Sequence, residues 1–204
     1  MALAIRDLGL LPYEEALALM RDLVGAVARG EAPDTLLVVT HPPVITLGRK
    51  RGARANVLAA GDIPVVEVER GGDATYHGPG QIVAYPVVKL AETGRDLHRF
   101  LRSLEDAVIR ALATLGVAGR REPGLTGVWV GDRKIASLGI AVRNWVTYHG
   151  VALNVAPDPG FAAIRACGLD SAVMTSLAEV TGRQWRPDEV KEALVAAMRE
   201  ALEP

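Results

Sequence analysis

Residues 70–86 read RGGDATYHGPGQIVAYP, and the four glycines of this stretch suit a backbone that turns with positive φ or approaches another group closely. Before it, Val65 to Glu69 alternates apolar and acidic residues, and after it Ile82 to Val88 is largely apolar, so each flank is typical of a strand. We therefore expect a loop at the rim of a sheet that carries Arg70, Tyr76 and His77. The alternative is a connection that only reverses the chain, but about ten residues are more than a reversal needs, which favours binding.

Composition limits the class of protein. The chain has 204 residues, half of them apolar, which predicts one domain over residues 1–204. The 23 basic residues nearly balance the 24 acidic ones, so neither nucleic acid nor a membrane is an expected partner. No secretion signal is apparent and no apolar run reaches the ~20 residues of a membrane span, so a cytoplasmic protein is expected. Two groups of basic residues stand out, one between Arg49 and Arg54 and the other at Arg120 and Arg121. Each group is either ordinary solvated surface or a binding surface for an acidic partner.

The pattern along the chain predicts an α+β fold. Helical spacing of apolar residues indicates helices over residues 12–29, 96–115 and 187–202, the second capped by Asp96 and stopped at Gly116. Short apolar runs indicate strands over residues 35–40, 44–47, 127–130, 133–142 and 148–155, and Gly131-Asp132 joins two of them as a hairpin. The predicted architecture is a single domain with a largely antiparallel sheet flanked by helices.

Cysteine and lysine supply the candidate chemistry. Cys167 is the single cysteine, which excludes an internal disulfide, and no Cys/His spacing fits a zinc site, so no metal is expected. Its thiol is either inert or reactive, and a reactive thiol needs a base or cation among His41, His77, His149 and Lys134. Strand alternation places Lys134 on an apolar face, where it either extends to solvent at the strand end, the commoner outcome, or is partly desolvated. The residues alone leave these choices open.

Residues 70–86 closely resemble the signature RGG-x-x-TYHGPGQ-x-V-x-YP of the octanoyl-acyl-carrier-protein:protein octanoyltransferases, the lipoate-protein ligase B family. Three other segments match that family in the same order: HPPVITLG at residues 41–48, KIASLG at residues 134–139, and CGL at residues 167–169 followed by TSL at residues 175–177. Ala166 stands where the family commonly has proline, a small departure that leaves the chemistry intact. The fold of this family resembles the catalytic domain of biotin and lipoate ligases, in agreement with the α+β prediction.

The resemblance implies transfer of an octanoyl or lipoyl group from acyl carrier protein to a lysine of lipoyl domains. Cys167 would be the nucleophile that forms an acyl-enzyme thioester, and Lys134 the second catalytic residue. The donor is already a thioester on a phosphopantetheine arm, so neither ATP nor a metal is expected. The implied acceptors are lipoyl domains of 2-oxoacid dehydrogenase E2 subunits and the glycine cleavage H protein, and a monomer is expected. The implied substrate-binding residues are Arg70, Gly71, Gly72, Asp73, Ala74, Thr75, Tyr76, His77, Ser137, Leu138, Gly139, His149, Gly150, Val151 and Ala152.

Two alternative functions stay open. An ATP-dependent lipoate or biotin ligase on the same fold also has an RGG-like loop, but adenylation needs no cysteine nucleophile. A non-catalytic module that binds acyl groups or lipoyl domains would keep an inert thiol, and the joint presence of Lys134 and Cys167 argues against it.

Overall fold

Two sheets define the architecture. The computed structural model describes residues 3–90, 95–165 and 173–203. The larger sheet has the strand order β1 (Ala4–Leu10), β2 (Thr35–Thr40), β6 (Gln81–Val87), β9 (Val146–Asn154), β8 (Arg133–Arg143) and β7 (Val128–Val130), and the smaller has the order β4 (Val65–Glu67), β3 (Val44–Leu47) and β5 (Ala74–His77). Among these described strands, β1–β2 and β3–β4 pair in parallel and the other neighbours pair antiparallel. The predicted α+β fold with a largely antiparallel sheet is confirmed.

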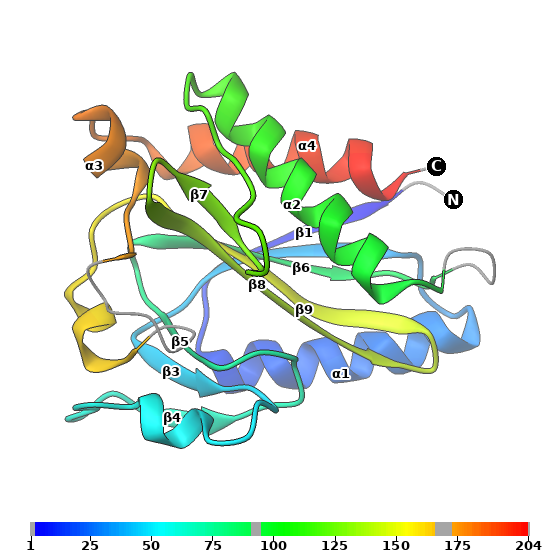
Figure 1. Ribbon diagram of the computed structural model, residues 1–204. Coiled ribbons are helices and arrows are strands. Elements are labelled where there is room, and N and C mark those ends of the chain that lie inside the picture. Colours follow the sequence, from blue (N-terminus) through cyan, green and yellow to red (C-terminus); the bar gives the residue numbers. More distant parts are fainter. Residues whose placement is uncertain (1–2, 91–94, 166–172, 204) are drawn as a thin grey trace.

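Helices cover both faces of the larger sheet (Figure 1). α1 (Tyr13–Arg29) packs on one face, and α2 (Leu97–Thr114) and α4 (Pro187–Leu202) pack on the other. In β2, Leu36 and Val38 belong to the core under α2 and α4, while Leu37 and Val39 belong to the core under α1. Burial on both faces explains why β2 is a continuous apolar run. Within the described ranges, no helix is both long enough and apolar enough to span a membrane.

The helix ends are closed by cap residues, one of which, Asp96, the sequence predicts. Asp96 accepts a hydrogen bond from the N–H of Arg99 at 3.0 Å and so caps α2. Gly30 ends α1 with a φ of 76°, a left-handed conformation that glycine adopts without steric cost. Ser176 accepts from the N–H of Glu179 at 3.3 Å and begins the short helix α3 (Leu177–Thr181). These caps confirm the boundaries expected for α1 and α2 to within a residue.

The structure corrects the prediction that residues 70–81 form one loop. Ala74–His77 is a strand, β5, which pairs antiparallel with β3 in the smaller sheet. All four of its side chains are buried, so its sequence lacks the alternation that marks a half-exposed strand. The glycines flank this strand, with Gly72 at a φ of 88° before it and Gly78 after it. The sequence pattern also gives no signal for β1, an edge strand whose side chains are exposed or half-buried.

Candidate active site

Three predicted substrate-binding segments meet at one cavity, called here the first cavity. The pairing of β8 with β9 places Ser137, Leu138 and Gly139 opposite Ala152, Val151 and Gly150. The segment after Arg70 is tied to β8 because Gly71 donates its N–H to the carbonyl of Ile140 at 2.9 Å. All the predicted substrate-binding residues except Gly71 and Tyr76 line this cavity. Segments that are far apart in the sequence therefore form one site.

Two glycines allow the walls of the first cavity to approach closely. Gly139 and Gly150 lie opposite each other in the β8–β9 pair. A Cβ on Gly150 would lie 2.3 Å from the carbonyl oxygen of Ala84 in β6, a distance that real side chains do not reach. A Cβ on Gly139 would lie 3.0 Å from the carbonyl oxygen of Gly71. Gly139 and Gly150 thus allow close packing of the backbone around the cavity.

Gly71 and Tyr76 lie outside the first cavity. Gly71 borders a neighbouring cavity described below. The ring of Tyr76 packs edge-on against Phe161 at 5.3 Å between centroids, and its hydroxyl donates to Asp158 at 2.7 Å. Tyr76 therefore holds β5 against the segment after β9 and does not line the first cavity.

Three lining residues were not predicted: Tyr13, Val83 and Tyr85. Val83 and Tyr85 lie on β6, one strand away from the predicted residues of β9, and Tyr13 begins α1. Strand alternation puts Val83 and Tyr85 on one face of β6, but this signal becomes informative only through the pairing of Val83 with Ala152, one of the predicted residues. Tyr13 carries no such signal, since only the packing of α1 on the sheet brings it to the cavity.

A buried cluster of histidines and tyrosines surrounds the first cavity. His77 stacks on Tyr13 at 5.8 Å and meets His41 edge-on, also at 5.8 Å between centroids. The Tyr13 hydroxyl lies 3.3 Å from Nδ1 of His149, and the Tyr85 hydroxyl lies 2.8 Å from Nε2 of His41. His41 directly follows Thr40, the last residue of β2. Its Nδ1 lies 2.7 Å from the carbonyl of Leu11, so His41 links the chain before α1 to the back of this cluster.

Burial keeps these histidines neutral. It lowers the pKa of His41 to about 4, because the hydrogen bond to the Leu11 carbonyl only partly offsets desolvation. Burial and the positive charge of Arg70 lower the pKa of His149 to about 4. The pKa of His77 is lowered well below its ordinary value by burial, and then by His41 and Arg70. The cluster therefore adds no charge of its own to the cavity wall near neutral pH.

Hydrogen bonds fix the segment that begins at Arg70. Arg70 is 8 % exposed, and its Nη2 donates to the carbonyl and to the hydroxyl of Thr46 at 2.9 and 2.8 Å. Asp73 accepts from the N–H of Ala74 and from Asn56 Nδ2, each at 2.7 Å, and pairs with Lys50 at 2.8 Å. Burial raises the pKa of Asp73, but these donors outweigh it and the net pKa is lowered. The segment is therefore anchored by hydrogen bonds and an ion pair, and the lowered pKa keeps the Asp73 carboxylate ionised near neutral pH.

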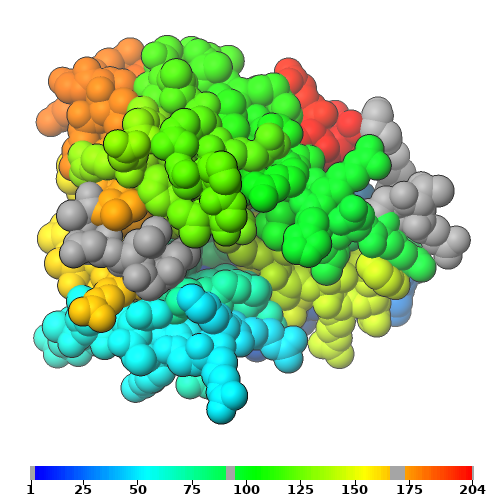
Figure 2. Space-filling view, viewed as in Figure 1, coloured from blue at the N-terminus to red at the C-terminus, as the bar shows by residue number. Residues whose placement is uncertain are grey.

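Lys134 borders a second cavity of about 380 Å³. This second cavity shares Gly72, Asp73, Leu138 and Gly139 with the first. Figure 2 shows this face hollowed between the cyan and green parts of the chain. The lining of the second cavity includes Lys50, Leu101 and residues 124–126. The Lys134 side chain does not extend to solvent: it is 1 % exposed, and Nζ donates to the carbonyl of Thr126 at 2.9 Å. The sequence left open whether this lysine reaches solvent at the strand end or is desolvated, and in the structure its side chain is buried.

The predicted nucleophile, Cys167, lies outside the described residues. The chain on either side of residues 166–172 is anchored by backbone hydrogen bonds. Arg165 donates its N–H to the carbonyl of Asn56 at 2.8 Å, and Thr175 donates its N–H to the carbonyl of Lys134 at 2.9 Å. Within the described ranges, no group of three or more His, Cys, Asp and Glu side chains is arranged to hold a metal ion.

Comparison with known proteins gives close relatives. An octanoyltransferase of Geobacter metallireducens is 54% identical over 180 residues, which is 88% of this chain and 84% of that protein. An octanoyltransferase of Chloroflexus aurantiacus is 46% identical over 213 residues, covering 99% of this chain and 96% of that protein. A probable octanoyltransferase of Pyrobaculum aerophilum is 51% identical over 174 residues, or 85% of this chain and 75% of that protein.

Solved structures agree on the fold at lower identity. A lipoate-protein ligase A bound with ATP superposes with a TM-score of 0.79 at 20% identity, over 99% of this chain and 86% of that one. Biotin protein ligase from Aquifex aeolicus gives a TM-score of 0.58 at 14% identity, over 100% of this chain and 69% of that one. The family of the lipoyl protein ligase A/B catalytic domain matches residues 12–199. The chain therefore belongs to the lipoyl protein ligase A/B catalytic-domain family and, within it, to the octanoyltransferases.

Proposed function

We propose that this chain transfers an octanoyl group from acyl carrier protein to the lysine of a lipoyl domain, through a thioester on Cys167 and without ATP or a metal. The observation that carries the proposal is the extended similarity to proteins named octanoyltransferase, together with a buried lysine beside a cavity at the position the family motif assigns. The first cavity is the site for the acyl chain, because its two lining histidines, His77 and His149, are neutral and part of its wall is apolar, as at Val83, Leu138 and Val151.

The second cavity is the approach to the reacting atoms. It borders Lys134, and it shares a wall with the acyl site. The phosphopantetheine arm of the donor and, later, the lysine of the acceptor would enter by this route. Lys50 lies at this cavity and is more than half exposed, and Arg49 and Arg51 beside it in the chain are exposed. These cations suit an acidic carrier protein.

The reaction proceeds in two balanced steps. In the first, Cys167 attacks the thioester carbonyl, the carbon–sulfur bond to the phosphopantetheine breaks, and the arm leaves as a thiol with the proton that Cys167 gave up. Lys134 assists either by taking that proton or, when protonated, by holding the thiolate as an ion pair. In the second, the acceptor amine attacks the acyl-enzyme thioester, Cys167 leaves, and Lys134 accepts the proton of the amine. The product is an amide, which is more stable than a thioester, so this step gives the reaction its direction.

ATP-dependent ligation is the second candidate function. Lipoate and biotin ligases share the fold, but at 20% identity or less that likeness extends to the fold alone. The relatives at about half identity carry the octanoyltransferase name instead. We therefore rank ATP-independent transfer first.

Intact-protein mass spectrometry tests the proposal. The purified chain, mixed with octanoyl-acyl carrier protein and no ATP, should gain one octanoyl group that maps to Cys167 and is discharged by adding a lipoyl domain. Cys167→Ser should gain no thiol-linked group, and Lys134→Met should load at least ~100-fold more slowly. Lys134→Arg distinguishes the two roles of the lysine, because arginine keeps the charge but cannot accept a proton. Loading only in the presence of ATP and a free fatty acid would favour the ligase, and full transfer by Cys167→Ala would contradict the covalent mechanism.

A further inference from the structure

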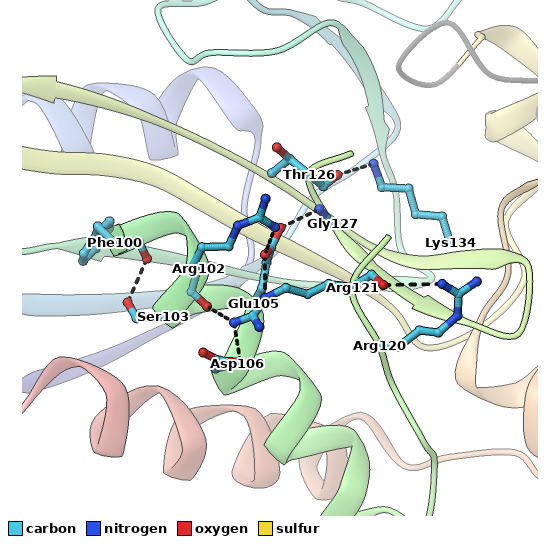
Figure 3. A network of polar contacts seen from close by, with 10 residues as sticks. All are labelled: Phe100, Arg102, Ser103, Glu105, Asp106, Arg120, Arg121, Thr126, Gly127 and Lys134. Atoms are coloured by element: carbon cyan, nitrogen blue, oxygen red, sulfur yellow. Dashed lines mark hydrogen bonds and ion pairs between the residues drawn. The ribbon is translucent and has the colours of Figure 1, made fainter. Parts of the chain in front are cut away.

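A buried carboxylate on α2 contacts the chain segment beside Lys134 (Figure 3). Glu105 is 0 % exposed, whereas every other buried residue of α2 is apolar. One oxygen of Glu105, Oε2, accepts from Arg102 Nη1 at 2.7 Å and from Arg121 Nε at 3.1 Å. The other oxygen, Oε1, accepts from the backbone N–H of Gly127 at 2.9 Å. Burying a charge is costly, so a carboxylate at this place needs the full set of partners that it has.

The N–H that Glu105 binds belongs to the same peptide group that binds Lys134. This group joins Thr126 to Gly127, and its carbonyl oxygen accepts from Lys134 Nζ at 2.9 Å. One rigid peptide plane is therefore bonded to the carboxylate on its N–H side and to the lysine on its oxygen side. Hydrogen bonds in such a chain strengthen one another, because a carboxylate that accepts from the N–H makes the carbonyl oxygen a better acceptor.

Gly127 is needed for this arrangement. Its φ is 138°, a backbone conformation that residues with a side chain rarely adopt. A Cβ at this position would lie 2.5 Å from Cε of Lys134 and 2.8 Å from the carbonyl oxygen of Ala136. The peptide group thus lies directly against the lysine side chain, and its orientation is set by Glu105.

We propose that Glu105 is a positioning residue for Lys134, which acts through the peptide group between Thr126 and Gly127. This inference rests on the proposed function, in which Lys134 assists Cys167. Glu105 fixes the direction of the Thr126 carbonyl, and that carbonyl holds the lysine amine at the second cavity. Arg102 and Arg121 in turn hold the carboxylate, so α2 serves the chemistry as well as the core.

The test is a double-mutant cycle with two readouts. Glu105→Ala and Lys134→Met are made singly and together, and each is measured for the rate of octanoyl loading and for the rate at which iodoacetamide alkylates the thiol at neutral pH. Because the chain has one cysteine, alkylation reports on Cys167 alone and needs no substrate. Glu105→Ala should lower the loading rate about 10- to 100-fold with little change in the KM for octanoyl-acyl carrier protein. Glu105→Ala should also slow alkylation when made in the parent chain. When it is added to Lys134→Met, the alkylation rate should not change further.

Two further variants separate positioning from folding. Glu105→Gln keeps an oxygen that can accept from the Gly127 N–H, so it should retain loading within about threefold of the parent. Asp106→Asn is the matched control: Asp106 is the next residue of α2, pairs with Arg121 on the half-exposed side, and should leave both rates within about twofold. Thermal unfolding of each variant identifies any that fail to fold.

The outcomes distinguish this inference from the proposed function. If Lys134→Met is inactive while Glu105→Ala loads at the parent rate, the positioning role is wrong and the function stands. If Glu105→Ala slows alkylation equally in both backgrounds, its effect does not pass through Lys134 and the inference is overturned. If Lys134→Met itself loads normally, the catalytic role of the lysine is wrong, and the positioning role is wrong with it.

Discussion

The buried histidines predict that mild acid destabilises this protein. His41 and His149 are 0 % and 1 % exposed, and burial lowers the pKa of each from 6.5 to about 4. In the unfolded chain both return to the ordinary value. Between pH 6.5 and pH 4 the unfolded chain therefore binds protons that the folded protein does not. The free energy of unfolding is thus unaffected by these groups above pH 6.5 and decreases as the pH falls through that window.

The magnitude follows from the two pKa values. At pH 5 each histidine is almost fully protonated in the unfolded chain and mostly neutral in the folded protein. Since one pKa unit corresponds to about 1.4 kcal/mol, the step from pH 7 to pH 5 removes roughly 2 kcal/mol per histidine and roughly 4 kcal/mol for the pair. His77 acts in the same direction, because its pKa is also lowered. The lowered pKa values of Glu69 and Asp73 matter chiefly at more acidic pH, where carboxylates begin to protonate.

Urea unfolding at pH 7, 6 and 5, followed by far-ultraviolet circular dichroism, measures this loss. His41→Gln removes one titrating group, so its loss between pH 7 and pH 5 should be smaller than that of the parent by roughly 2 kcal/mol, whatever its stability at pH 7. His98→Gln is the control, because His98 lies exposed on α2 and the variant should keep the parental pH dependence. Equal pH dependence in His41→Gln and the parent would refute the reasoning.

Two glycine substitutions at the first cavity should have different consequences. Gly150→Ala places a Cβ 2.3 Å from the backbone of β6, so it should lower the free energy of unfolding by about 2 kcal/mol or more, measured by urea denaturation at pH 7. Gly139→Ala places a Cβ 3.0 Å from the Gly71 carbonyl, so it should cost less stability but raise the KM for octanoyl-acyl carrier protein about tenfold by displacing the 70–73 segment. Equal stability losses in the two variants would contradict this distinction.

Much of the fold follows from local patterns. The apolar stripes of α1 and α2, the cap at Asp96 and the hairpin between β7 and β8 are all local, and each lies where the sequence predicts it. The substrate-binding segments follow instead from the family resemblance. The structure then adds their geometry, because the pairing of β8 with β9 puts two of those segments opposite each other.

What the sequence does not predict depends on partners distant in the chain. β5 is buried on all sides by β3 and its surroundings, so it has no period that separates strand from loop. β1 is held by its parallel pairing with β2, and its own residues form a weak pattern. Tyr13 reaches the cavity only through helix packing. The role of Glu105 is not predicted for the same reason. In the sequence it is one acidic residue of a helix, and its partners Gly127 and Arg121 lie 22 and 16 residues away.

The two cavities differ in the charged and titratable groups of their walls, and this difference fits the roles proposed for them in the reaction. Histidines around the first cavity are held neutral by burial, and the cation in its wall, Arg70, is held by Thr46, so these groups suit an acyl chain that must be bound without reacting. The ionisable groups that would move protons or hold a thiolate border the second cavity, where Lys134 is linked through one peptide to Glu105. Gly72, Asp73, Leu138 and Gly139 form the boundary shared by both cavities. In the proposed reaction, a thioester carbonyl at this boundary would have its apolar chain on one side and Lys134 on the other, so one wall would both bind the substrate and direct its reactive carbon toward the proposed catalytic groups.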